Sequence, residues 1–299
     1  MNRLNYEKVF KTLVEETGNY LINHSLRAMV LGVSGGIDST VVAAICCEVN
    51  KQTNIPLIGR SLPIKNKKDE FDVSKLVGEA FCNNFDVANL YDEYKCFLSG
   101  LVWREERIDL LDDTETMHPE KSKQQTLIAN GNIQARLRMI YLYNLASIHN
   151  GLVMSTDNQT EYQLGFWTIH GDVGDFDPIQ DLWKTEVYQL AEWLKLFYYT
   201  DGDDADKAVA IGESIKLTPT DGLGISNSDL DQIGAKSYSD VDRVLQTLVC
   251  PASPENDRVQ DALTVEIGPE IIDKIIKRRR NSRFKREKSP IYISREKYE

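Results

Sequence analysis

The stretch from Leu31 to Thr40, which reads LGVSGGIDST, limits what this chain can fold into more than any other stretch. An apolar run of strand length, Ala28–Val33, leads into the two glycines, and a second apolar run, Val41–Ile45, follows them with the character of a buried helix. Two glycines beside a small hydroxyl residue allow a tight turn, in which backbone N–H groups approach an anion at the N-terminus of the helix. The stretch therefore predicts a strand, a phosphate-binding turn and a helix, in that order.

Asp38 lies in the first turn of this helix, where a carboxylate either caps the helix or holds Mg²⁺ beside a phosphate. The glycines alone also fit an ordinary strand-to-helix turn with Asp38 as its cap. The complete string SGGxDS is more specific. It resembles the pyrophosphate-binding loop of the N-type ATP pyrophosphatases, enzymes that cleave ATP between its α and β phosphates. The chain contains no GxxxxGK[ST] string, so this loop is not of the Walker type.

The order of the apolar runs indicates the fold class. Strands that alternate with helices predict an α/β fold, a doubly wound parallel sheet with helices on both faces. Such sheets bind ligands at the carboxyl ends of their strands, which is where the glycine turn lies. We expect one domain over residues 1–299. The predicted strands are Ala28–Val33, Pro56–Leu62, Phe85–Leu90 and Leu152–Ser155, and the predicted helices cover residues 4–22, 37–45, 69–81, 124–149, 184–194 and 240–248.

Several charged stretches lack apolar residues at the regular spacing of a helix or a strand. Residues 109–120 (DLLDDTETMHPE) are interpreted as a surface excursion and residues 201–206 (DGDDAD) as a disordered turn. The loop over residues 171–178 holds three carboxylates, which fit either a solvated loop or a binding site. Residues 277–288 contain eight cationic side chains and one acidic side chain. This run indicates a phosphate-rich ligand or a nucleic acid, or else a solvated helix end that the helix dipole favours.

The overall composition excludes several classes of protein. A net charge of −11 argues against general binding to nucleic acid or to an anionic membrane surface. No apolar run approaches the roughly 18 residues of a membrane span, and the N-terminus has no secretory core, so we expect a cytoplasmic protein. The five cysteines lack CxxC spacing and the four histidines are scattered, so neither a disulfide framework nor a zinc site is indicated.

Taken in order, five stretches of the chain resemble the motifs of the NAD synthetases, with the resemblance covering residues 4–290. It implies an adenine nucleotide alpha hydrolase-like fold and a ligase that amidates nicotinic acid adenine dinucleotide (deamido-NAD) to NAD. In that reaction ATP adenylylates the substrate carboxylate, ammonia displaces AMP, and Mg²⁺ is the cofactor. The sequence shows no match to the nitrilase-like glutaminase domain of longer family members, so the resemblance implies free ammonia as nitrogen donor, or a partner that supplies it. The family also implies a homodimer. The five stretches are Gly32–Ser39, Asn132–Met139, Ser155–Glu161, Gly171–Thr185 and the basic C-terminal segment.

The resemblance also assigns roles to single residues. Asp38 and Lys184 are the implied catalytic residues, and Asp38 and Glu161 are the implied Mg²⁺ ligands. Asp175 is the best match for a substrate-binding aspartate, although the spacing also allows Asp177. The implied ATP-binding residues are Gly32, Val33, Ser34, Gly35, Gly36, Ile37, Asp38, Ser39, Thr156, Lys184 and Thr220, and the implied residues for deamido-NAD are Asn132, Arg136, Asp175 and Lys285.

The chain departs from the family pattern at Ile169, where many members have a substrate-contacting lysine, and at Phe284, where they have histidine. Three alternatives therefore stay open. The chain is another N-type ATP pyrophosphatase, similar to GMP synthetases or tRNA-modifying enzymes. It is a non-catalytic nucleotide-binding homologue. Or it is a synthetase that acts on an altered dinucleotide.

Overall fold

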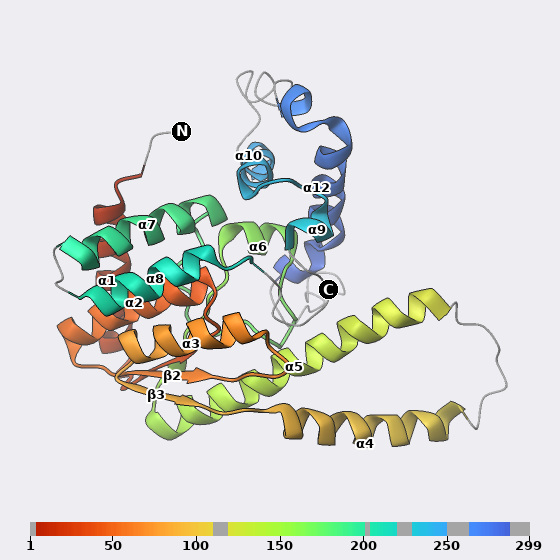
Figure 1. The fold of residues 1–299 in the computed structure, drawn as a ribbon, viewed down its shortest axis with the longest axis horizontal. Coiled ribbons are helices and arrows are strands. Elements are labelled where there is room, and N and C mark those ends of the chain that lie inside the picture. The colour runs from red at the N-terminus through yellow and green to blue at the C-terminus, as the bar shows by residue number, and fades with distance from the viewer. Residues whose placement is uncertain (1–3, 110–118, 201–203, 220–228, 250–262, 288–299) are drawn as a thin grey trace, which may run out of the picture.

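The chain forms a parallel sheet covered by helices, as a computed structural model of residues 4–109, 119–200, 204–219, 229–249 and 263–287 shows (Figure 1). Within these residues four strands lie in the order β3-β2-β1-β4, and all neighbouring strands are parallel. This arrangement confirms the predicted α/β class. The strands are shorter than the apolar runs suggested: β1 is Met29–Gly32, β2 is Leu57–Ser61, β3 is Asn84–Val87 and β4 is Leu152–Val153.

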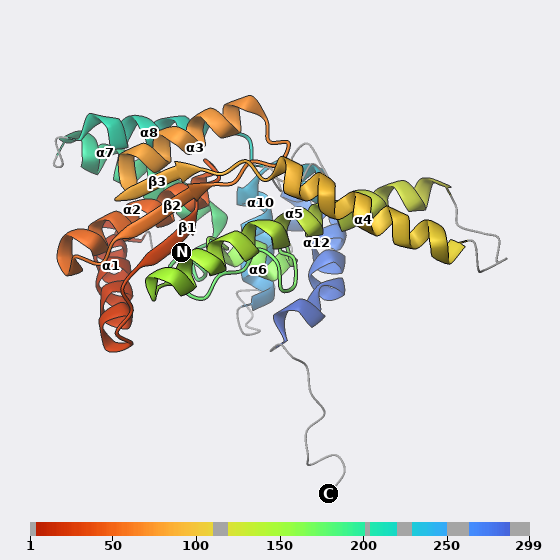
Figure 2. The same cartoon turned by 90° about the horizontal axis from the view of Figure 1, so that it is seen from below.

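Two layers of helices cover the two faces of the sheet. Helices α2 and α3 contact one face, with α1, α7 and α8 packed on them, and the C-terminal half of α5 contacts the other face, with α4 packed beside α5 (Figures 1 and 2). Their bounds are α1 Tyr6–Asn23, α2 Ile37–Thr53, α3 Lys68–Phe81, α4 Tyr91–Asp109, α5 Pro119–His149, α7 Lys184–Thr200 and α8 Ala205–Lys216. Among the described residues, no helix is both long enough and apolar enough to cross a membrane.

Strand β1 shows how the sequence sets this layering. Its side chains alternate between the two faces, as a strand requires. Met29 and Leu31 belong to the core under α1, α2 and α7, whereas Val30 belongs to the core under α5. Because both faces are buried, the strand is a continuous apolar run rather than an alternating one, as expected in a parallel sheet covered on both sides.

The chain order of the strands creates a switch point beside β1. The chain builds β2 and β3 on one side of β1 and then returns to place β4 on its other side. The loops that follow β1 and β4 therefore lead away from each other across the sheet edge and leave a crevice between them. The SGGIDS turn follows β1, and residues 155–161 follow β4, so the topology brings these two stretches together.

A third group of helices stands next to this crevice. It consists of α6 Gln159–Leu164, α9 Asp229–Ile233, α10 Tyr238–Val249 and α12 Pro269–Asn281, followed by a short 3₁₀ turn at Arg283–Arg286 (Figure 1). Leu164, Leu245 and Ile275 lie in its core, which is separate from the two cores of the sheet. The C-terminal part of the chain thus packs around α6 and forms one wall of the crevice.

Of the described helices, the sequence reading missed α4, α6, α8 and α9, and it gave α12 only as the open alternative of a helix end at residues 277–288. The predicted surface excursion at 109–120 lies mostly outside the described residues, and its last two residues begin α5, which therefore starts earlier than expected. Residues 201–203 also lie outside the described residues. Asp204 was assigned to a disordered turn, but its side chain accepts a hydrogen bond from the backbone N–H of Lys207 and caps α8.

In both views α4 and the N-terminal half of α5 run side by side away from the sheet (Figures 1 and 2).

Candidate active site

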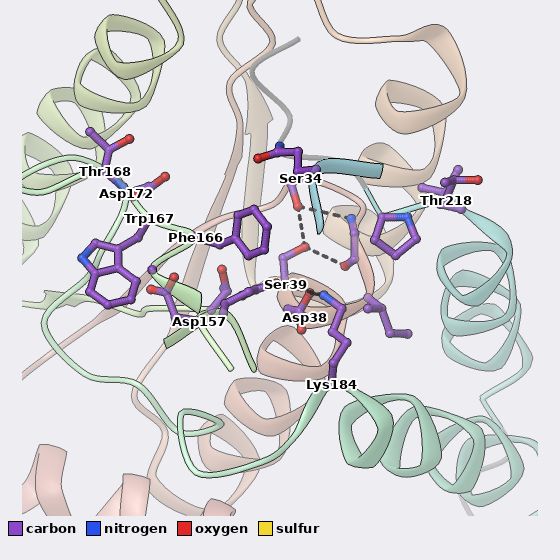
Figure 3. Close-up of a pocket in the computed structure, with 18 of the residues that line it drawn as sticks. Ser34, Asp38, Ser39, Asp157, Phe166, Trp167, Thr168, Asp172, Lys184 and Thr218 are labelled. Carbon is purple, nitrogen blue, oxygen red and sulfur yellow. Dashed lines mark hydrogen bonds and ion pairs between the residues drawn. The ribbon is translucent and has the colours of Figure 1, made fainter. Parts of the chain in front are cut away.

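A cavity of about 650 Å³ opens at the carboxyl ends of β1 and β4. Its walls come from the turn after β1, the loop after β4, the starts of α2 and α7, the end of α8 and the C-terminal helices. Figure 3 shows Ser34, Lys184 and Thr218 on one side of Phe166, with Trp167 and Asp172 on its other side. The cavity therefore has two ends, and the glycine turn lies at the first.

Hydrogen bonds within the glycine turn hold its shape. The Ser34 and Ser39 hydroxyls lie 2.9 Å apart, and the Gly36 N–H donates to the Ser34 hydroxyl over 3.2 Å. Gly36 is the N-cap of α2 and has no side chain with which to satisfy the first N–H groups of the helix. Amides at such a helix start are well suited to an anion, and Gly36, Ile37 and Asp38 line the cavity.

Gly35 is the residue of the turn that only glycine can occupy. Its φ of +85° is one that other residues rarely adopt. A Cβ at this position would lie 2.7 Å from the Glu70 carbonyl oxygen and 2.8 Å from the Ser74 backbone nitrogen, both on α3. Because these are backbone atoms of a packed helix, neither can move aside cheaply.

We therefore expect Gly35→Ala to lower the free energy of unfolding by about 2 kcal/mol and to weaken nucleotide binding. Gly100→Ala is the matched control, since Gly100 lies inside α4 with no atom within 4 Å of an added Cβ. There alanine should stabilise the protein by about 0.5 kcal/mol. Urea denaturation of both variants measures the difference, and equal effects at the two positions would contradict it.

Three charged side chains meet beside the turn. The Lys184 Nζ lies 2.5 Å from Asp38 Oδ2 and 3.0 Å from Glu161 Oε1. Lys184 is only 2% exposed, whereas the two carboxylates are 15% and 17% exposed. Burial alone would lower the pKa of Lys184, but the two carboxylates raise it well above its ordinary value. The amine is therefore held protonated between two acids at the wall of the cavity.

The surrounding elements fix each member of this group. Glu161 belongs to the capping box of α6, in which the Asn158 side chain accepts from the Glu161 N–H and the Glu161 side chain accepts from the Asn158 N–H. The Asn158 amide also donates to Asp38 Oδ1 over 2.9 Å. Lys184 begins α7, and its backbone N–H donates to the Thr160 hydroxyl. The start of α6 therefore orients residues that come from three parts of the chain.

The donor set fits a magnesium ion. Asp38 and Glu161 present two carboxylates, and Mg²⁺ in nucleotide enzymes is held by one or two carboxylates together with phosphate oxygens and water. Among the described residues, no group of three or more His, Cys, Asp and Glu side chains is arranged to bind a metal alone. A metal at this site would thus need ligands from a bound phosphate chain.

The other residues assigned from the sequence divide into three groups. Thr156, Asn132 and Lys285 line the same cavity, and the Lys285 amine donates to the carbonyls of Gly165 and Trp167. Gly32, Val33 and Gly35 lie behind the residues that line it. Thr220 lies outside the described residues, next to Thr218 and Pro219, which line the cavity.

Arg136 and Asp175 do not line the cavity. The Arg136 guanidinium is exposed and donates to the Ile169 carbonyl over 3.0 Å. Asp175 accepts from the Tyr143 hydroxyl and from the Val153 N–H, so it ties the loop to α5 and β4. Of the three loop aspartates, Asp172 is the one that lines the cavity.

The sequence reading missed a residue behind the cavity wall, Asn158, and two in the wall itself, Phe166 and Trp167. Asn158, which orients Asp38, is signalled by its position three residues before Glu161, since this spacing is that of a capping box. No comparable signal marks Phe166 and Trp167, whose rings lie on a loop. The Arg278 guanidinium stacks 3.7 Å from the Phe166 ring centroid. Of the basic run, Arg278 and Lys285 line the cavity, whereas Arg279 and Arg286 donate to Gln163.

Burial determines the protonation of Asp177, a loop residue that does not line the cavity. Its Oδ1 accepts from the Ile179 N–H, while its Oδ2 is buried with no hydrogen-bond partner among the described residues. Burial raises the pKa of Asp177 to about 7. An unfolded chain has an aspartate pKa near 3.9, so ionisation of Asp177 disfavours the folded state.

Stability should therefore fall as the pH rises from about 4 to about 7 through this group. We expect Asp177→Asn, which keeps the Oδ1 acceptor and does not titrate, to be more stable than the parent by about 3 kcal/mol at pH 8. The advantage should shrink steadily toward pH 5. Urea denaturation at pH 5, 6.5 and 8 tests this, and a pH-independent difference would contradict the assignment of Asp177.

Comparisons with known proteins agree on one family. Residues 9–289 match the family model described as NAD synthase. The NH(3)-dependent NAD(+) synthetase of Thermoplasma acidophilum is 35% identical over 221 residues, which cover 72% of this chain and 75% of the relative. The protein of the same name from Pyrococcus furiosus is 28% identical over 288 residues, which cover 96% and 94%.

Solved structures share the fold. The NMN synthetase from Francisella tularensis superposes with a TM-score of 0.72 at 23% identity, covering 98% of this chain and all of that one. The NH3-dependent NAD synthetase from Campylobacter jejuni gives a TM-score of 0.66 at 22% identity, covering 97% of this chain and all of that one. Both similarities extend over the sheet, its helices and the C-terminal segment.

Proposed function

Because the chain belongs to the NAD synthase family, a family of ligases, we propose that it amidates deamido-NAD to NAD with ATP and ammonia. The observation that carries this proposal is the group of Asp38, Glu161 and Lys184 beside a glycine turn. A turn of this kind binds phosphate, and the charges beside it suit a polyphosphate with its metal. The second end of the cavity leaves room for the other substrate.

The proposed chemistry has two steps. The nicotinate carboxylate oxygen attacks the α-phosphorus of ATP, the bond from that phosphorus to the bridging oxygen breaks, and pyrophosphate leaves. Ammonia then attacks the carbonyl carbon of the acyl-adenylate, the bond to the AMP oxygen breaks, and the surplus proton passes to solvent. Both steps need positioning and charge stabilisation more than acid–base catalysis by the protein.

The described residues supply these effects. Lys184 offsets the charge that develops on the departing pyrophosphate, and the amides from Gly36 to Asp38 bind its oxygens. Asp38 and Glu161 would hold Mg²⁺, which neutralises the polyphosphate when bound. Asn132 and Lys285, farther along the cavity, would contact deamido-NAD, while Thr156 and the loop that contains Thr220 would contact ATP.

A direct assay tests the function. Purified protein with ATP, Mg²⁺, ammonium and deamido-NAD should yield NAD, AMP and pyrophosphate in equal amounts, measured by chromatography. A parallel reaction with nicotinic acid mononucleotide tests the substrate, since one structural relative is named an NMN synthetase. Formation of ADP, or of neither amide product, would overturn the proposal and favour another adenylylating enzyme or a non-catalytic homologue.

We also propose a homodimer through the outer face of α5. Ile140 and Ile148 on this helix are 66% and 67% exposed, and Tyr143 lies between them. Exposed apolar side chains in one patch mark an interaction surface. Arg136 and Asp175 lie at the same face, so a dimer would give these two assigned residues a place beside a second subunit.

Sedimentation equilibrium should therefore give a mass twice that of the chain, and Ile140→Glu should shift it to the monomer, since a buried carboxylate opposes association. Leu196→Glu, at an equally exposed apolar position on α7, is the control and should stay dimeric. A monomeric parent protein would contradict the proposal.

A further inference from the structure

A residue far along the chain, Ser214, holds the glycine turn from the side that faces away from the cavity. The Ser214 hydroxyl on α8 donates to the Gly35 carbonyl over 2.8 Å. Because Ser214 uses its own proton there, it can only accept from the Thr40 hydroxyl on α2, which lies 2.9 Å from it and 2.9 Å from the Gly36 carbonyl and shares one proton between the two acceptors. Ser214 is 1% exposed, so water does not compete for these bonds.

This anchor sets the direction of the next amide. In a trans peptide the carbonyl of Gly35 and the N–H of Gly36 point in opposite directions. With the carbonyl held toward α8, the Gly36 N–H points to the Ser34 hydroxyl, and both Ser34 and Gly36 line the cavity. Gly35 itself does not line it. The hydroxyl of Ser214 therefore keeps the Gly35 carbonyl directed away from the cavity, and leaves the Gly36 N–H on the Ser34 hydroxyl at the cavity wall.

Such an anchor matters because glycines flank this peptide on both sides. Glycine adopts positive and negative φ with similar ease, so a Gly-Gly peptide can rotate at low cost. Rotation would turn the Gly35 carbonyl oxygen into the cavity, where it would repel phosphate oxygens. α3 crowds Gly35 from one side, but only Ser214 is recorded as donating a hydrogen bond to its carbonyl among the described residues.

We propose that Ser214 is a positioning residue for nucleotide binding, which holds the Gly35–Gly36 peptide in the orientation that accepts a phosphate. This inference rests on the proposed function only in that the turn binds the phosphates of ATP. α8 ends at Lys216, and the residues that follow it, Leu217, Thr218 and Pro219, line the cavity. α8 thus helps to position both the glycine turn and the cavity wall beside it.

Calorimetry of ATP and of pyrophosphate with Ser214→Ala tests the proposal. We expect both dissociation constants to rise about tenfold, as loss of one well-formed hydrogen bond to the turn predicts. The KM for ATP should rise likewise, while the KM for deamido-NAD stays within twofold of the parent value. Thr40→Val, which keeps the bond between Ser214 and Gly35, should weaken ATP binding only two- to threefold.

Thr17→Val is the control, because Thr17 is also buried and its hydroxyl donates to the Leu13 carbonyl within α1, away from the turn. It should change stability without changing ATP binding. Unchanged ATP binding in Ser214→Ala, an equal loss in Thr17→Val, or an equal rise of both KM values would overturn the proposal. If Ser214→Ala does not fold, Ser214→Cys, whose thiol is a weak donor, takes its place, and unchanged binding of ATP and pyrophosphate in that variant would overturn the proposal. A parent protein that binds ATP but makes no NAD would instead refute the proposed function.

Discussion

Lys184→Ala should lower kcat for pyrophosphate release about 10²- to 10³-fold, the loss expected when one preorganised charge is removed from a reacting group. The amine lies within ion-pair distance of both Asp38 and Glu161. Without it the departing pyrophosphate loses a positive charge, and the two carboxylates lose their common partner. The rate is measured with a coupled pyrophosphate assay at saturating ATP.

The same substitution should also lower stability, by about 2 kcal/mol, since two largely buried carboxylates lose an ion pair. Lys207→Ala separates this effect from catalysis. Lys207 is a second buried lysine, paired with Asp204 at 2.6 Å, and it does not line the cavity. It should cost similar stability and leave kcat within threefold of the parent value. If Lys184→Ala retained the parent rate while folded, the catalytic role of Lys184 would be refuted.

The sequence predicted the sheet and its crevice well because the relevant signals are local. Apolar runs of strand length, a glycine turn and a helix start are all set by neighbouring residues, and parallel connections leave few topologies. The meeting of Asp38 with Glu161 then follows from the place of β4 beside β1. Lys184 joins these two carboxylates because it is the first residue of α7, which begins beside the same crevice.

The sequence reading missed several helices for physical reasons that single stretches do not reveal, and α8 is the clearest case. α8 begins in an acidic run that favours disorder by composition, yet Asp204 at the end of that run is an N-cap. The apolar side chains that hold α8 down, such as Ile211, pack against α2 and α7, which are distant in sequence. Tertiary packing therefore stabilises α8, although the composition of the residues where it begins favours disorder.

The different positions of the three aspartates in the loop over residues 171–178 could not be predicted from the sequence either. Three aspartates lie within six residues, and His170, two residues before the first of them, has a φ of +52°. Small changes of direction in such a loop decide which carboxylate faces the cavity. Asp172 faces it, Asp175 ties the loop to α5, and Asp177 lies buried beneath. No pattern of spacing distinguishes these three outcomes.

Asp38→Asn should lower kcat/KM about 10²-fold and raise the Mg²⁺ concentration for half-maximal rate about tenfold. The substitution keeps the size of the side chain and the oxygen that accepts from Asn158. It removes the negative charge that faces Lys184 at 2.5 Å and, in the proposed function, a ligand of the metal. Titration of Mg²⁺ at fixed ATP measures the shift, and Glu161→Gln should move it in the same direction.

Asp242→Asn tells whether any buried aspartate near the site would have this effect. Its carboxylate accepts from the Thr160 hydroxyl over 2.5 Å and from the Thr185 N–H over 2.9 Å, but it does not line the cavity. This variant should lose stability and keep the parent requirement for Mg²⁺, since it supports the starts of α6 and α7 without facing the ligand. A Mg²⁺ requirement that rises equally in both variants, or in neither, would mean that Asp38 is not a metal ligand.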